Sequence, residues 1–113
     1  LEDGTPSTIW DPLTGKIDQS IAAQWTKYDL RLYTEKNWQT LGPKLQGKLN
    51  IWMGDMDNFY LNNAMHLYQE MLSTQKEPVS NAEFTWVRGA GHCDYKQVPM
   101  LEKIMIQMQQ KLP

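Results

Sequence analysis

The chain has 113 residues, of which 41% are apolar, and a formal net charge of −2 at pH 7, so its length fits one small domain with one modest core. This charge balance argues against a nucleic-acid partner, because phosphate backbones are bound by clustered Lys and Arg. The single cysteine excludes an internal disulfide and a multi-cysteine zinc site, and no apolar run approaches the length of a membrane span.

Residues 1–47 are predicted to form an irregular lead-in followed by a helical excursion. Leu1–Gly15 is rich in Gly, Pro and Asp, which favour turns. The chain begins at Leu1 with neither a start methionine nor a signal peptide. We therefore expect it to be a piece cut from inside a longer protein.

Two short helices are predicted in the second part of this segment. Asp18 can cap a helix with apolar residues at spacings of three and four, which should end near Tyr28. Asp29 can cap a second helix through about Asn37, and the Gly42-Pro43 pair is expected to stop helical structure.

Residues 48–113 are predicted to form two strand-helix units. Leu49–Met53 is a short, largely apolar run typical of a strand covered on both faces, and Gly54 ends it. A helix with one apolar face follows, from Leu61 to about Gln75.

After a polar linker at Lys76–Asn81, the second strand is predicted at Glu83–Val87. The closing helix carries an apolar stripe, formed by Leu101, Ile104, Met105, Met108 and Leu112. A strand-helix-strand order predicts parallel strands joined by a right-handed crossover. The fold class is therefore α/β, with two parallel strands and flanking helices. Two strands do not make a stable sheet alone, which again suggests a piece of something larger.

The candidate site residues lie directly after the two strands. Asp55 and Asp57 follow the first strand, and His92 follows the second through a Gly-Ala-Gly run. Adjacent ends of parallel strands would place a carboxylate beside an imidazole, about 2.6–3.2 Å apart, which is an acid and base arrangement. Asp57 is the favoured acid and Asp55 the alternative. Both aspartates could instead satisfy backbone amides at the start of the next helix.

The neighbouring residues suggest no other chemistry. A calcium loop is disfavoured, because Phe59 stands at the next ligand position and no glycine follows in the loop. Cys93 is expected to be packed, since adjacent side chains in an extended loop point apart. His66 is expected at the surface of a helix. No metal or cofactor is expected.

At these residues the chain resembles a known family. GKLNIWMGDMDNFYLNNAMHLYQEML, followed by a short strand and GAGHCDY, is similar to the C-terminal half of esterases of the α/β-hydrolase superfamily related to esterase D, feruloyl esterases and enterochelin esterases. The lead-in WDPLTGKIDQSIAAQWTKYDL is similar to the segment that precedes this motif in some bacterial members, so the resemblance covers most of the chain.

The resemblance implies that Asp57 is the acid and His92 the base of a catalytic triad. It also implies that Leu49–Met53 and Phe84–Val87 are the last two strands of an eight-stranded sheet, and it slightly favours a periplasmic or secreted location. The chain departs from the family in having no G-x-S-x-G nucleophile elbow and no oxyanion-hole loop.

The chain is therefore interpreted as the C-terminal part of an esterase-like serine hydrolase that acts on small-molecule or carbohydrate-linked esters. Alone it is predicted to be inactive, because acid and base have no nucleophile to activate. The alternative is a non-catalytic interaction or carbohydrate-associated module that uses exposed Trp10, Trp25 and Trp38.

Self-association is expected through the exposed sheet edge. The surfaces expected to be buried between copies are those of Trp52 and Met53 and the helix faces bearing Trp25 and Met65. Neither nucleic acid nor membrane is an expected partner.

Overall fold

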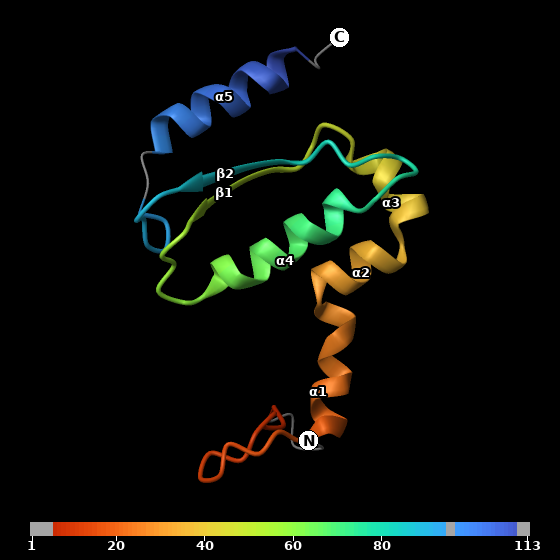
Figure 1. The fold of residues 1–113 in the computed structure, drawn as a ribbon, viewed down its shortest axis with the longest axis vertical. Helices are drawn as coiled ribbons and strands as arrows, with labels where there is room; N and C mark the ends of the chain where they lie inside the picture. The colour runs from red at the N-terminus through yellow and green to blue at the C-terminus, as the bar shows by residue number, and fades with distance from the viewer. Residues whose placement is uncertain (1–5, 95–96, 111–113) are drawn as a thin grey trace. The chain divides into compact units, whose positions relative to one another are not determined.

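The computed structural model describes residues 6–94 and 97–110. The chain divides into two compact units, Leu1–Lys36 and Asn37–Pro113 (Figure 1). The sequence placed the division after residue 47. The structure places it earlier because Trp38, at the start of the second unit, belongs to the core of that unit.

The first unit opens with a closed turn inside the segment that was expected to be irregular. Trp10 and Ile17 form an antiparallel bridge. Between them, the Asp11 carboxylate accepts hydrogen bonds from the backbone N–H groups of Leu13 and Thr14, at 2.8 and 3.1 Å. A side chain that bonds the backbone two and three residues on stabilises a tight turn.

The helices of the first unit begin where the sequence predicts. Helix α1 (Gln19–Trp25) is capped by Asp18, whose carboxylate accepts from the first free backbone N–H groups. It continues into the 3₁₀ turn η1 (Thr26–Tyr28), which confirms the predicted end near Tyr28. Helix α2 (Leu30–Lys36) follows, with Asp29 accepting from a backbone N–H in its first turn.

Helix α3 (Trp38–Leu45) contradicts the prediction that the Gly42-Pro43 pair stops helical structure, because it contains both residues. Gly42 is a packing residue: a Cβ there would lie 2.7 Å from the Trp38 ring and 3.0 Å from Pro78. A turn at Asn37 separates α2 from α3, which confirms the predicted end of the second helix near Asn37.

The second unit is built on a two-stranded parallel sheet. Strand β1 (Asn50–Gly54) pairs with β2 (Glu83–Val87) in register from Asn50 opposite Glu83 to Gly54 opposite Val87. Helix α4 (Leu61–Ser73) and helix α5 (Gln97–Gln109) lie on opposite faces of this sheet (Figure 1). The predicted α/β class with parallel strands is confirmed.

The core of the second unit lies on the α4 side of the sheet. Trp38, Met71 and Leu72 are its buried members, and partly buried residues that include Leu49 and Phe84 pack against them. The Trp38 indole N–H donates to the Pro78 carbonyl at 2.8 Å. Trp38 is only 5% exposed, so the expectation that it is an exposed ligand-binding tryptophan is wrong.

A polar side chain of helix α5, that of Lys103, contacts the other face of the sheet. Lys103 pairs with Glu83 and lies 5.4 Å from the centre of the Trp52 ring. The predicted apolar stripe exists, but Leu101, Met105 and Met108 are exposed. Leu112 lies outside the described residues.

Candidate active site

The site begins with a close approach of two loops at the carboxyl ends of the strands. A Cβ at Gly54 would lie 2.3 Å from the carbonyl oxygen of Ala90 and 2.5 Å from that of Gly91. Only glycine leaves space for the loop after β2 to pass against the end of β1. The Met56 N–H then donates to the Ala90 carbonyl at 3.0 Å, which links the two loops beyond the sheet.

Asp57 is buried in the first of these loops, with a side chain only 1% exposed. Its Oδ1 accepts from the Phe59 N–H at 2.8 Å and from the Leu61 N–H, the first amide of α4, at 3.4 Å. The alternative role considered for the aspartates, satisfying amides at the start of this helix, therefore holds for Oδ1. These bonds leave Oδ2 for a second partner.

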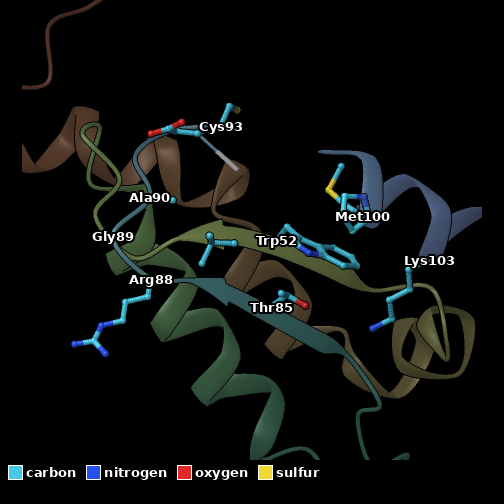
Figure 2. Close-up of a pocket in the computed structure, with 11 residues that line it drawn as sticks. Trp52, Thr85, Arg88, Gly89, Ala90, Cys93, Met100 and Lys103 are labelled. Carbon is cyan, nitrogen blue, oxygen red and sulfur yellow. The ribbon is translucent and has the colours of Figure 1, made fainter. Parts of the chain in front are cut away.

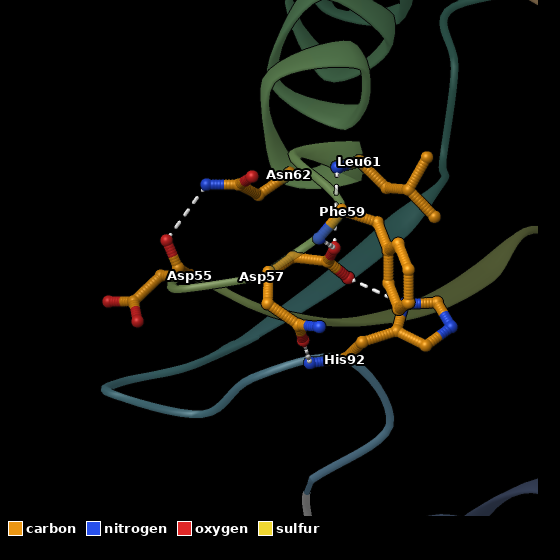
Figure 3. A network of polar contacts seen from close by, with 7 residues as sticks. Asp55, Asp57, Phe59, Leu61, Asn62 and His92 are labelled. Carbon is orange, nitrogen blue, oxygen red and sulfur yellow. Dashed lines mark hydrogen bonds and ion pairs between the residues drawn. The ribbon is translucent and has the colours of Figure 1, made fainter.

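That partner is His92, whose Nδ1 lies 2.8 Å from Asp57 Oδ2 (Figure 3). The contact confirms the predicted distance and the prediction that both loops emerge at one edge of the sheet. The Phe59 ring meets the imidazole edge to face, with centroids 4.9 Å apart and planes at 81°. With Nδ1 occupied by the carboxylate, Nε2 is the ring nitrogen left for a substrate or nucleophile.

The environment keeps Asp57 ionised at neutral pH. Burial alone would raise the pKa of this carboxyl group, but the hydrogen bonds from His92, Phe59 and Leu61 outweigh it. The net effect lowers the pKa of Asp57 below its ordinary value. The group is thus a permanent acceptor for the imidazole.

Asp55 has a different role. Its Oδ1 accepts from the Gly89 N–H at 2.6 Å, and its backbone carbonyl accepts from the Asn62 side chain at 2.8 Å. Asp55 therefore joins the loop after β1 to the loop after β2 and to α4. The structure brings Asp57, and not Asp55, to the imidazole of His92.

Sequence reasoning missed Asn58. Its Oδ1 accepts a hydrogen bond from the backbone N–H of His92 at 3.1 Å. A single asparagine in a polar loop carries no periodic signal, and its partner lies 34 positions away in sequence. Only the folded arrangement of the two loops reveals the contact.

The prediction for Cys93 is wrong, whereas the prediction for His66 is confirmed. Cys93 is exposed, so the expectation that it is packed is wrong. Its φ of 56° is left-handed, and the loop is therefore not extended at this residue. His66 lies at the surface of α4 as predicted, where its ring stacks on Trp86 with centroids 3.9 Å apart.

A separate cavity of about 940 Å³ lies on the α5 face of the sheet (Figure 2). Trp52 and Met100 line it, together with Cys93 from the histidine loop. The Arg88 side chain points away from Trp52. His92 and Asp57 are not among the residues that line this cavity.

The described residues, 6–94 and 97–110, carry neither a metal-site nor a membrane-span signal. No group of three or more His, Cys, Asp or Glu side chains in this part of the chain could hold a metal ion. No helix there has the length and apolar composition needed to cross a bilayer.

Comparisons of the chain with protein-family models, with curated proteins and with solved structures gave no match.

Proposed function

We propose that this chain supplies the acid and the base of a Ser-His-Asp ester hydrolase, with Asp57 as acid and His92 as base. The observation that supports it is the 2.8 Å contact between Asp57 Oδ2 and His92 Nδ1, made by a buried carboxylate that two backbone amides also hold. The two strands would be the last two of the larger sheet of an α/β-hydrolase.

The mechanism follows from this geometry. Asp57 accepts the Nδ1–H of His92, which leaves Nε2 unprotonated and basic. Nε2 takes the proton of a serine hydroxyl as its oxygen attacks the ester carbonyl. The imidazolium then gives this proton to the departing alcohol. Water, deprotonated by the same Nε2, releases the acid from the acyl-enzyme and restores the serine.

The serine has to come from outside these 113 residues, because none of the serines in the chain lies in a G-x-S-x-G sequence. The chain alone should therefore give no turnover of an activated ester above background. The substrates of the whole enzyme would be small-molecule or carbohydrate-linked carboxylic esters.

The test uses the full-length gene product, assayed with p-nitrophenyl acetate and labelled with a serine-directed fluorophosphonate. Asp57→Asn and His92→Ala should each lower kcat by about 10⁴-fold. His66→Ala, which removes the exposed histidine of α4, is the matched control and should keep the full rate. Wild-type rates in both site variants would contradict the proposal.

The alternative function, a carbohydrate-associated module, depends on exposed aromatic side chains. Trp10 and Trp25 are 56% and 52% exposed, but Trp38 is buried and unavailable. Calorimetric titration with oligosaccharides would identify such a module by binding that Trp10→Ala and Trp25→Ala abolish.

A further inference from the structure

The imidazole of His92 is less enclosed than its carboxylate partner. The Asp57 side chain is 1% exposed and the His92 side chain 40% exposed. Two backbone amides hold Asp57 in addition to the histidine. Asp57 is therefore the fixed member of the pair. The loop that carries His92 determines where the imidazole lies relative to it.

Three hydrogen bonds join the loop that carries His92 to the loop that carries Asp57. The Asp55 side chain accepts from Gly89, the Met56 N–H donates to Ala90, and Asn58 accepts the backbone N–H of His92 itself. The first two bonds hold residues that precede the histidine. They are separated from it by Gly91, which permits a wide range of backbone angles.

We propose that Asn58 is the positioning residue of the site: its side-chain carbonyl anchors the backbone of His92 so that Nδ1 faces Asp57. This inference builds on the proposed function. Asn58 and Asp57 are consecutive, so one short segment holds both the main chain and the ring of the histidine. Loss of the backbone anchor would let the imidazole move relative to a carboxylate that stays in place.

Imidazole ¹⁵N chemical shifts of the 113-residue chain report the tautomer of His92 directly. In the wild type the neutral ring should carry its proton on Nδ1, facing Asp57. Asn58→Ala removes the acceptor, and Asn58→Leu removes it while keeping a side chain of similar size. Each should raise the fraction of the Nε2–H tautomer about three- to tenfold, the effect of one ordinary hydrogen bond.

Two variants serve as controls. Asn58→Asp keeps an acceptor oxygen at the same position and should retain the wild-type tautomer. Asn63→Ala makes the same chemical change at an exposed position in the first turn of α4 and should also leave His92 unchanged. A wild-type tautomer in folded Asn58→Ala or Asn58→Leu would overturn the proposal. Unfolding of both variants while Asn58→Asp folds would overturn it too, since Asn58 would then be a stability residue.

Kinetics of the full-length gene product separate this inference from the proposed function. Asn58→Ala should lower kcat by about 10–100-fold with KM unchanged, as is typical when a residue supporting a functional side chain is removed. An altered tautomer in a protein without esterase activity would support the positioning role and refute the ester hydrolase. Esterase activity with an unaltered tautomer in Asn58→Ala would support the ester hydrolase and refute the positioning role.

Discussion

The two carboxylate oxygens of Asp57 have separate partners. The sequence predicted the pairing of Asp57 with His92, but it did not predict the contact of Asn58 or the exposure of Cys93. Parallel strands end at one edge, so a carboxylate after β1 and an imidazole after β2 had to be neighbours. The contact of Asn58 depends on how two irregular loops meet. The exposure of Cys93 depends on a left-handed backbone angle that its neighbours in sequence do not encode.

Lowering the pH should remove part of the unfolding free energy that Asp57 contributes. The folded chain lowers the pKa of this carboxyl group, so the ionised form stabilises the folded state at pH values above about 4. This contribution is lost as the pH falls through the lowered pKa. Urea unfolding of wild type and Asp57→Asn should therefore show a stability difference at pH 7 that shrinks near pH 3. An equal difference at both pH values would contradict the linkage.

Gly54→Ala should separate the two loops of the site. The new Cβ would collide with two backbone carbonyl oxygens, so the loop after β2 has to shift. We expect a loss of about 1–3 kcal/mol in unfolding free energy, measured in urea, together with loss of the Asp57–His92 contact in ¹⁵N spectra. Gly91→Ala is the control for the stability measurement alone, because its Cβ would lie at an ordinary 3.5 Å from Asn58 Oδ1 and should cost less unfolding free energy. Equal effects of the two substitutions would refute this account.

At the scale of elements, the sequence predicted those with a clear period or cap. Asp18 and Asp29 marked the starts of α1 and α2, and alternating apolar residues marked β2. Helix α3 was missed because its glycine and proline are ordinarily helix breakers. Packing overrides that preference: the absent Cβ of Gly42 makes room for the Trp38 ring one turn earlier in the helix and for Pro78 from a distant segment.

Trp38 should be the tryptophan that matters most for the stability of the second unit. Trp38→Ala would leave a cavity in the core and leave the Pro78 carbonyl without its indole donor. The expected loss is about 3–5 kcal/mol, measured by urea unfolding followed by circular dichroism. Trp25→Ala, at a half-exposed position, should cost less than about 1 kcal/mol. A small effect of Trp38→Ala would contradict the assignment of this core.

At the scale of the whole molecule, β1 has a paired side and an open side. Its paired side faces β2, where Leu49 accepts from Glu83 and Asp55 donates to Val87. Because backbone directions alternate along a strand, the amides of Asn50 and Trp52 face away from β2. Within the described part of the chain no strand pairs with them.

We expect the chain to form a two-fold dimer through this edge, or by exchange of an element, at high micromolar concentration. Size-exclusion chromatography with light scattering measures the mass directly. Asn50→Pro removes one outward N–H at the first residue of β1, where proline is tolerated, and should shift the equilibrium towards monomer. A wild-type chain that stays monomeric at these concentrations would refute this expectation.

Lys103 makes the docking of α5 dependent on ionic strength. Its ammonium group pairs with Glu83 and faces the Trp52 ring, and both charged side chains are about half exposed. Dissolved ions screen such contacts, since the Debye length is about 8 Å at 0.15 M and about 3 Å at 1 M. Concentrated salt should therefore speed deuterium uptake in α5 while the amides that pair β1 with β2 stay protected. The same conditions would uncover the Trp52 face of the sheet without unfolding the tryptophan core on its other side.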